Sequence, residues 1–290
     1  MEPNAYGPFD YVPITGRKKL TWPGGARLAF WLVPNIEIFH LDTEMPGGKG
    51  KIPDVSTWGG RDYGNRVGVF RFMDVFAKFG FRPTAALNSE ICDVCPQIVE
   101  AGTKNGWEWM AHNRTNTIRL NDVDTAEQEA ELIHDVLDRI EKETGTRPKG
   151  WLSSGRQQSW RSLELLAEAG CTFTGDWSND DQPVRMKAGN KTVVCLPYGT
   201  GISDKSAFER INCTPEEFTN MICTAFDVLY RESEDSGRVA CVSIHPYLTG
   251  VPHRIGALER ALEYICSHDG VWLATGSEIA DHFLAQDTST

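Results

Sequence analysis

Short apolar runs alternate along the chain with longer segments whose apolar residues recur every three or four positions. The first run, from Arg27 to Val33, is bounded by Gly and Pro, as expected for a strand buried on both faces. Apolar residues at helical spacing follow Asn65, and Gly80 ends the helix that they predict. This alternation is typical of parallel β/α architecture.

The rest of the chain repeats the pattern. Residues 1–26 are rich in Pro and Gly and read as an irregular lead-in, whereas Phe39–Gly60 is a long connection of the kind that usually forms a functional loop or lid. No internal repeat is visible, so a single domain over residues 1–290 is expected. Further strands are predicted at 83–88, 107–111, 150–153, 171–176, 192–196, 238–245 and 271–274, and further helices at 95–104, 125–144, 159–169, 214–232 and 255–267.

An α/β barrel and a doubly wound sheet both agree with this pattern. No strand is followed by a G-x-G-x-x-G turn, and no G-x-x-x-x-G-K-[ST] sequence occurs. Nucleotide binding therefore has little support, and we expect no organic cofactor.

The acidic composition limits the partners of the protein. The chain has a formal net charge of -11 and a pI near 5.1, and its only basic cluster is Arg17-Lys18-Lys19. A nucleic-acid partner is not expected, because a phosphate backbone requires clustered cations. The N-terminal residues lack the pattern of a secretory signal, and the run Leu28–Val33 is far too short to cross a bilayer. We therefore expect a cytoplasmic protein with no membrane partner.

Polar residues follow the first predicted strand, at the strand end where an α/β barrel keeps its chemistry. Asn35 and Glu37 lie two positions apart, which places them on the same side of an extended chain. They could supply a metal ligand, a general base or a hydrogen-bond donor. The alternative is a solvated strand exit.

Two histidines also stand at predicted strand ends. His112 follows the strand 107–111, and Asn116 comes four residues later, so the two side chains could converge on one ion in a tightly turned segment. His245 ends the strand 238–245, before Pro246. Its ordinary pKa of about 6.5 suits a general acid that protonates a leaving nitrogen. Structural roles in the core or at a cap are the alternatives for both histidines.

Other residues near strand ends are candidates for binding the substrate. Asp176 begins a group of carboxylates that forms either acid/base machinery or a turn. His253 and Arg254 would open a helix and could bind an anionic group. Some of the aromatic residues should form the wall of a pocket. The candidate substrate-binding residues are thus Asn35, Trp151, Asp176, Trp177, Tyr247, His253 and Arg254.

Long motifs in the chain match a known family in the same order and over nearly the whole length. They are Arg61-Asp-Tyr-Gly-Asn-Arg-Val-Gly, Ala86-Leu-Asn-Ser-Glu, Gly106-Trp-Glu, Thr144-Gly-Thr-Arg-Pro-Lys-Gly-Trp-Leu, Asp176-Trp-Ser-Asn-Asp-Asp-Gln-Pro and Ser243-Ile-His-Pro-Tyr-Leu-Thr-Gly-Val-Pro-His-Arg-Ile. Through them the chain resembles the polysaccharide deacetylase (NodB-homology) superfamily, in particular its cytosolic branch of PuuE-type allantoinases and cyclic imide hydrolases.

The resemblance implies a distorted (β/α) barrel that hydrolyses amide-type C–N bonds. In metal-dependent members, the first strand gives two aspartates, a base and a ligand, and a His-x-x-x-His sequence gives two more ligands. At these positions this chain has Asn35, Glu37, His112 and Asn116. The resemblance therefore implies either one divalent metal, with zinc as the first candidate, held by Glu37, His112 and Asn116, or a metal-free site.

Two mechanisms follow from this comparison. With a metal, the ion would polarise the carbonyl group and lower the pKa of a bound water. Without one, Glu37 or an aspartate would activate water, while His112 and Arg61 stabilise the oxyanion. In both, His245 resembles the late histidine of the family, which protonates the departing nitrogen. The candidate catalytic residues are His245, Glu37, Arg61 and Asp62.

The resemblance also suggests a type of substrate. Members that act on sugars are typically exported, so a small soluble cyclic amide, ureide or imide is favoured for this chain. The alternatives are an N-deacetylase that acts on an acylated amino sugar and a catalytically silent barrel that binds a small ligand. Relatives suggest a homo-oligomer, with a tetramer expected.

Overall fold

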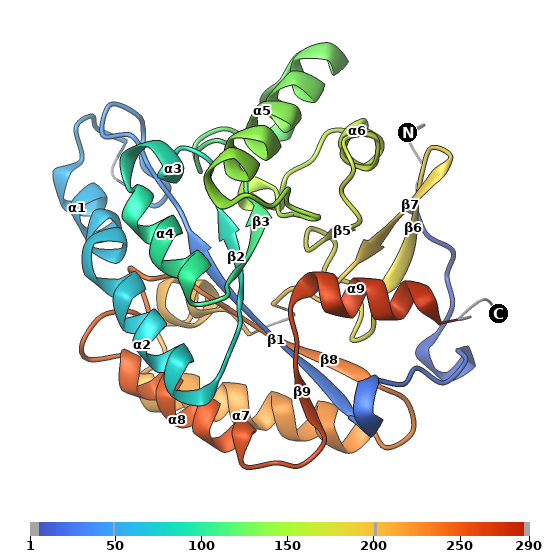
Figure 1. The fold of residues 1–290 in the computed structure, drawn as a ribbon. Coiled ribbons are helices and arrows are strands. Elements are labelled where there is room, and N and C mark those ends of the chain that lie inside the picture. The colour runs from blue at the N-terminus through green and yellow to red at the C-terminus, as the bar shows by residue number, and fades with distance from the viewer. Residues whose placement is uncertain (1–5, 49, 200–201, 287–290) are drawn as a thin grey trace.

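The computed structural model describes residues 6–48, 50–199 and 202–286. These residues form a curled sheet with helices packed on its outer side, an α/β half-barrel (Figure 1). The strand order is β6-β7-β5-β4-β3-β2-β1-β8, and β9 also pairs with β1. All of these pairings are parallel except that of β6 with β7. The predicted distorted (β/α) barrel is confirmed.

The order of elements follows the predicted alternation. The strands are β1 (Leu28–Ile36), β2 (Thr84–Leu87), β3 (Glu108–Ala111), β4 (Gly150–Trp151), β5 (Phe173–Thr174), β6 (Val184–Ala188), β7 (Lys191–Cys195), β8 (Arg238–Ile244) and β9 (Val271–Leu273). The α-helices are α1 (Val55–Tyr63), α2 (Val69–Phe79), α3 (Ile91–Val94), α4 (Pro96–Lys104), α5 (Ala126–Thr144), α6 (Ser162–Glu168), α7 (Pro215–Glu232), α8 (Ile255–Cys266) and α9 (Gly276–Ala285). Shorter helical segments are the 3-10 turns η1 (Ile14–Gly16), η2 (Pro23–Gly25), η4 (Leu120–Asp122) and η5 (Ser154–Arg156), and the π-helical η3 (Gly64–Gly68) and η6 (Lys205–Arg210).

Some elements differ from the sequence prediction. Helix α1 begins at Val55, inside the stretch predicted as a long connection, because the Asp54 carboxylate caps it by accepting a hydrogen bond from the Thr57 backbone N–H. Strand β6 was not predicted and pairs antiparallel with β7. Helix α9 was also not predicted, although Thr275 and Glu278 form a capping box at its start.

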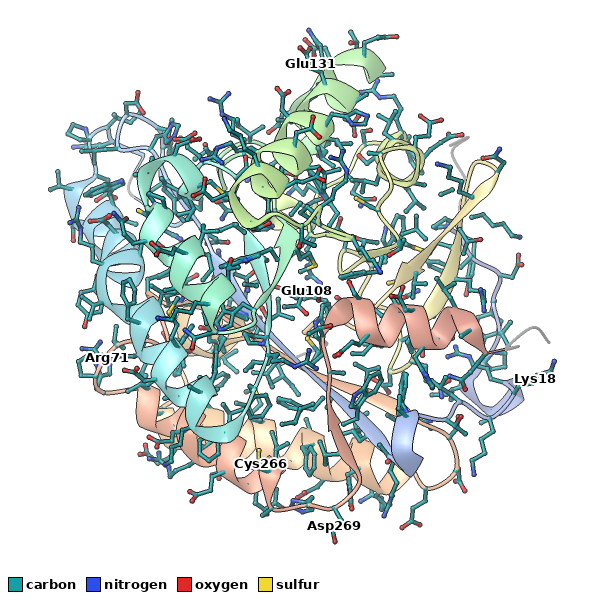
Figure 2. The ribbon with its side chains drawn as sticks, viewed as in Figure 1. Lys18, Arg71, Glu108, Glu131, Cys266 and Asp269 are labelled. Atoms are coloured by element: carbon teal, nitrogen blue, oxygen red, sulfur yellow. The ribbon has the colours of Figure 1, made fainter. Side chains whose placement is uncertain are left out.

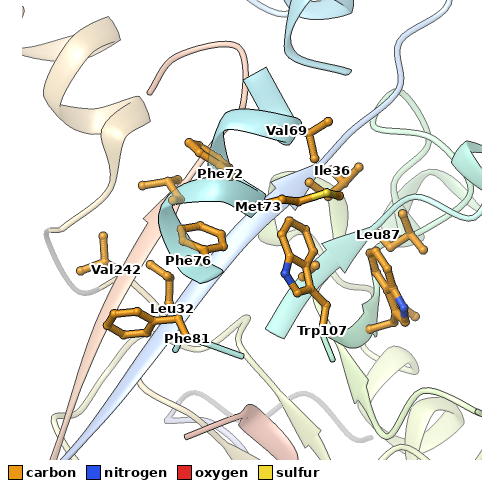
Figure 3. Close-up of a cluster of buried hydrophobic side chains, with 14 of the residues drawn as sticks. Leu32, Ile36, Val69, Phe72, Met73, Phe76, Phe81, Leu87, Trp107 and Val242 are labelled. Atoms are coloured by element: carbon orange, nitrogen blue, oxygen red, sulfur yellow. The ribbon is translucent and has the colours of Figure 1, made fainter. Parts of the chain in front are cut away.

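The core lies on both sides of β1, all of whose residues are buried. Leu32 and Ile36 face outward and belong to the cluster that contains Phe72 and Phe76 of α2 (Figure 3). Trp31 faces the other way, into the cluster inside the half-barrel. This alternation is the period of two that a strand imposes. No helix within the described ranges is long and apolar enough to span a membrane.

A partly buried carboxylate joins the start of α9 to the sheet. Glu108, at the beginning of β3, accepts hydrogen bonds from the Thr84 hydroxyl and from the Ser277 backbone N–H. Figure 2 shows Glu108 inside the fold near α9, whereas Lys18, Glu131 and Asp269 lie at the periphery. Because Glu108 lies at the amino ends of the strands, opposite their carboxyl ends, we interpret it as a stabilising residue.

The Arg61–Gly68 motif packs against the turn that follows β8. A Cβ atom added to Gly64 would lie 2.6 Å from the backbone N of Tyr247, and one added to Gly68 would lie 2.2 Å from the carbonyl O of Pro246. No side chain fits between such closely packed backbones. The glycines of this motif therefore set the position of the segment that begins at His245.

Replacing Gly68 with alanine is expected to lower the free energy of unfolding by about 1–3 kcal/mol, because the new methyl group must displace the Pro246 carbonyl. Urea denaturation measures this loss. Gly59→Ala is the matched control: its Cβ would meet nothing within 4 Å, and alanine is the better helix former in α1. Equal stability of the two variants would contradict the close packing at Gly68.

Candidate active site

A cavity of about 250 Å³ opens where the carboxyl ends of β1, β3 and β8 come together. This edge of a parallel barrel is where catalytic groups gather. A second cavity, of about 570 Å³, lies beside α7, but no histidine, lysine or arginine of the described ranges lines it. The smaller cavity is lined by five of the thirteen candidate residues predicted from the sequence, namely Asn35, Glu37, His112, Asn116 and His245. Its lining includes Asn35, Glu37, His112, Asn116, Ser153, Tyr198, Lys205, Ser243 and His245.

Glu37 lies between the two histidines of this cavity. Its Oε1 atom is 3.5 Å from Nε2 of His112 and 3.7 Å from Nε2 of His245. Burial alone would raise the pKa of the Glu37 carboxyl, but the positive charge of His245, the hydrogen bonds from the two histidines and the charge of Lys205 together outweigh burial and hold the pKa well below its usual value. Glu37 is therefore a carboxylate at neutral pH.

His245 is held by a buried aspartate on the side opposite Glu37. Its Nδ1 atom lies 2.7 Å from Oδ1 of Asp204, and the other Asp204 oxygen accepts hydrogen bonds from the His245 backbone N–H and the Thr249 hydroxyl. Burial would lower the pKa of His245, but the charges of Asp204 and Glu37 raise it to about 9. The ring is thus an imidazolium whose Nε2–H points toward Glu37.

His112 presents its second nitrogen to the same carboxylate. Its Nδ1 atom lies 2.6 Å from the Leu152 carbonyl oxygen, so Nδ1 carries a proton and donates to that oxygen, while Nε2 faces Glu37. Nε2 of His112, Oε2 of Glu37 and Oδ1 of Asn116 are buried atoms with no hydrogen-bond partner among the described residues. Buried polar atoms of this kind require hydrogen-bond partners, which a water molecule or a polar substrate can supply.

The floor of the cavity is a closed hydrogen-bond network around Asn35. Its amide Nδ2 donates to the Ser243 hydroxyl and the Ile244 carbonyl, and its Oδ1 accepts from the Tyr198 hydroxyl. The Tyr198 and Ser243 hydroxyl oxygens are 2.7 Å apart. Asn35 was predicted to bind substrate, and its amide is already engaged in this network. Its contacts position the floor beside Glu37.

The fold is shared with known proteins. A Schizosaccharomyces pombe protein assigned to the polysaccharide deacetylases is 27% identical over 98% of this chain and 96% of its own length. The peptidoglycan deacetylase of Helicobacter pylori is 25% identical over 78% of this chain and 86% of its own length. No family model matches the chain. The crystal structure of PuuE allantoinase is similar with a TM-score of 0.82 at 27% identity, covering 93% of this chain and 94% of that one.

The chain is thus similar over most of its length to proteins of the polysaccharide deacetylase superfamily. The superfamily resemblance implies a divalent metal, and the residues of the cavity do not fit one. Among the described residues, no group of three or more His, Cys, Asp or Glu side chains is placed to hold a metal ion. Of the expected ligands, Glu37 and His112 are ionisable, but Asn116 offers only a neutral amide oxygen. His245 is close, yet its protonated ring already faces Glu37.

Within this superfamily fold, Arg61 and Asp62 lie outside the main cavity. The Arg61 guanidinium donates to the Tyr247 hydroxyl and the Pro46 carbonyl, and it lies over the rings of Phe39 and Tyr247. Both of its terminal nitrogens are therefore engaged, and the predicted role of Arg61 in stabilising an oxyanion stays a prediction. Asp62 forms an ion pair with Arg66 on the next helical turn. Both residues line a separate cavity of about 60 Å³ that also contacts Glu37.

The other predicted substrate-binding residues do not line the main cavity. Trp151 is fully buried in the outer core because its side chain points away from the inside of the half-barrel. Asp176 accepts hydrogen bonds from Ser153 and Gln158, and burial raises its pKa. Of the remainder, Trp177 packs against Phe9, Tyr247 binds Arg61, His253 is exposed, and Arg254 lies over the Phe208 ring.

Several residues at the cavity were not found from the sequence. Asp204 and Lys205 lie at the start of η6, far along the chain from Glu37, and Tyr198 follows β7. No local motif marks them, because an isolated aspartate, lysine or tyrosine in a connection has many ordinary uses. Only the folded chain shows that Asp204 contacts His245.

The titration of His245 is expected to limit activity and stability at alkaline pH. Its pKa is about 9 in the folded protein and about 6.5 in an unfolded chain, so its stabilising contribution is complete below about pH 6.5 and is lost as pH rises through 9. The proton that the family resemblance assigns to the leaving nitrogen is lost over the same range. We expect kcat/KM and Tm to fall together between pH 8 and 10, on the order of one pH unit either side of that pKa. A flat profile to pH 10 would contradict the Asp204–His245–Glu37 arrangement.

Proposed function

We propose that the protein hydrolyses a C–N bond in a small soluble substrate, opening the ring of a cyclic amide, ureide or imide. The coarser activity, hydrolysis of C–N bonds other than peptide bonds, is common to deacetylases and allantoinases. The observation that carries the proposal is the Glu37 carboxylate beside the His245 imidazolium, which Asp204 holds in place. This arrangement pairs a base with an acid in one cavity.

The proposed reaction begins with a water molecule bound by the unpaired Oε2 of Glu37. Glu37 accepts a proton as the water oxygen attacks the amide carbon, and a tetrahedral oxyanion forms. The ammonium group of Lys205 lines the cavity close enough to lower the pKa of Glu37, and it would stabilise that oxyanion. His245 then gives its Nε2 proton to the departing nitrogen as the C–N bond breaks. The products are a carboxyl group and an amine or ureido group.

The size of the cavity supports a small substrate. Pockets for drug-sized ligands are typically about 300–1,000 Å³. At about 250 Å³, this cavity suits a single small ring better than several units of a glycan. A small polar ring also offers hydrogen-bond partners to the unpaired atoms of His112 and Asn116.

An N-deacetylase is the second candidate, because the same acid and base would also remove an acetyl group from an amine. The similarity to the peptidoglycan deacetylase of Helicobacter pylori supports it. The products separate the two functions: a deacetylase releases acetate, whereas ring opening gives one product that retains all the atoms of the substrate. The third candidate, a silent binding barrel, has less support because Glu37 and His245 remain ionisable and face each other.

The test is hydrolysis of a substrate panel followed by NMR. Allantoin, succinimide-type imides, dihydropyrimidine-type ureides and N-acetylglucosamine would be incubated with enzyme that has been treated with a chelator and with untreated enzyme. We expect ring-opened products and equal rates after chelation, because Glu37, His112 and Asn116 do not form a metal site. Acetate release alone would favour the deacetylase. No hydrolysis of any compound by folded protein would contradict an enzymatic function.

Cytoplasmic location and a homotetramer stay proposals. The first is tested by fractionation of cells that express the tagged protein, and the second by light scattering of the purified protein.

A further inference from the structure

Cations surround the mouth of the candidate active site. Arg119, Arg156, Lys205 and Arg210 line the cavity, and Glu37 is the only carboxylate that lines it within the described residues. The whole chain has a net charge of -11, so this local excess of positive charge runs against the composition. Positive charges that are concentrated in a cleft attract anionic ligands, even when the protein as a whole is acidic.

Among the described residues, the cavity cations also lack the carboxylate partners that several basic residues elsewhere have. Arg17, Arg139 and Arg147, for example, each bind a carboxylate within 3 Å. Among the described residues, no carboxylate forms an ion pair with Arg119, Arg156, Lys205 or Arg210; Arg156 donates to the hydroxyl of Ser178. Their charges are therefore available to a ligand.

These cations come from separate parts of the chain. Arg119 follows β3, Arg156 ends η5 after β4, and Lys205 and Arg210 lie at the two ends of η6 after β7. Arg156 has a φ angle of 55°, a left-handed conformation that is costly for a residue with a Cβ atom. The three arginines are exposed, whereas Lys205 is partly buried and close enough to Glu37 to lower its pKa. Lys205 thus lies deeper than the arginines.

We infer that the substrate is an anion, a small amide that carries a carboxylate or similar acidic group away from the bond that is hydrolysed. Arg119, Arg156 and Arg210 bind this group at the mouth, while the C–N bond lies between Glu37 and His245. Guanidinium groups suit this task because their parallel N–H groups match the two oxygens of a carboxylate. The inference rests on the proposed function for the position of the reacting bond, and the anion-binding site stands on the cavity itself.

The experiment compares substrates that differ only in charge. Hydantoin-5-acetate and hydantoin-5-acetamide have the same ring and nearly the same size, and a phosphonate analogue tests the type of anion. We expect kcat/KM to be at least about 30-fold higher for the carboxylate at low salt, with the preference falling at 0.5 M NaCl as exposed charges are screened. Equal kcat/KM values for acetate and acetamide would overturn the inference.

Single substitutions of the three arginines test which of them bind the anionic group. Arg119→Gln, Arg156→Gln and Arg210→Gln are each expected to raise KM for the acetate by about 10-fold, while kcat and the kinetics of the acetamide stay unchanged. Arg114→Gln is the matched control, because Arg114 is exposed, pairs with Glu90 and does not line the cavity. The assignment of the anion site to these arginines would be contradicted if Arg114→Gln lost the preference for hydantoin-5-acetate over hydantoin-5-acetamide. It would also be contradicted if all three cavity variants kept that preference.

Binding measured by calorimetry separates this inference from the proposed function. If neither hydantoin is hydrolysed, the proposed function fails, and tighter binding of the acetate than of the acetamide still supports the anion site. If both are hydrolysed and bind equally, the proposed function stands and the anion site is refuted. A preference for the phosphonate over the carboxylate would support the anion site and refute the carboxylate as its ligand.

Discussion

Replacing His245 with alanine is expected to lower kcat by about 10³-fold on the substrate of the wild-type enzyme, because the leaving nitrogen then has no proton donor. The imidazolium lies between Asp204 and Glu37, at 2.7 Å and 3.7 Å, so its Nε2 proton faces the carboxylate proposed to activate water. The alanine variant should remain folded, since Asp204 keeps its hydrogen bonds from the His245 backbone and Thr249. Circular dichroism checks the fold, and steady-state kinetics measure the loss.

His245→Gln provides a second variant in case the alanine protein is too unstable to purify. The glutamine amide can donate a hydrogen bond to Asp204, but it cannot transfer a proton, so kcat should fall to a similar level. His253→Ala is the control, because His253 is exposed and does not line the cavity. Retained turnover in the folded His245 variants would refute its role as the acid.

The proximity of Glu37 and His245 could be anticipated from the sequence, because both follow predicted parallel strands. Strands β1 and β8 are neighbours, with Pro34 opposite Ile244, so the residues that follow them emerge side by side. His112 follows β3 at the same edge of the sheet. What the pattern cannot supply is the strand order, which decides whether residues at strand ends are close or far apart.

Other features of the site depend on contacts that no periodicity encodes. Asp204 reaches His245 from a connection after β7, and Tyr198 closes the network at Asn35 from the same part of the chain. A residue in a conspicuous sequence motif can also have a structural role. Arg61 was a candidate for catalysis, but its guanidinium lies between the rings of Phe39 and Tyr247 and binds the Pro46 carbonyl.

The long Arg61–Gly68 motif can therefore be explained by packing and hydrogen bonding. Its glycines allow η3 to approach the turn after β8, and its arginine ties that turn to the loop at Pro46. The motif shapes the surroundings of His245, and Arg61 and Asp62 do not line the main cavity. A conspicuous sequence can thus lie beside a candidate site and position its residues through packing.

Replacing Glu37 with glutamine is expected to lower kcat by at least about 10³-fold, because an amide of the same shape cannot accept a proton from water. The substitution should also change His245. The negative charge of Glu37 helps to raise the pKa of His245, so that pKa should fall below 9 in the variant. NMR titration of the His245 ring measures the pKa, and steady-state kinetics measure the rate.

The two readouts separate a catalytic role of Glu37 from a structural one. A carboxylate that only stabilised the fold would, once replaced, change the free energy of unfolding but leave kcat nearly intact. Glu234→Gln is the matched control, because Glu234 is an exposed carboxylate that pairs with Arg27 far from the cavity. Turnover near the wild-type rate in Glu37→Gln would place the base on another residue. An unchanged pKa of His245 in this variant would show that the charge of Glu37 does not act on His245, and would contradict the proposed pairing of base and acid.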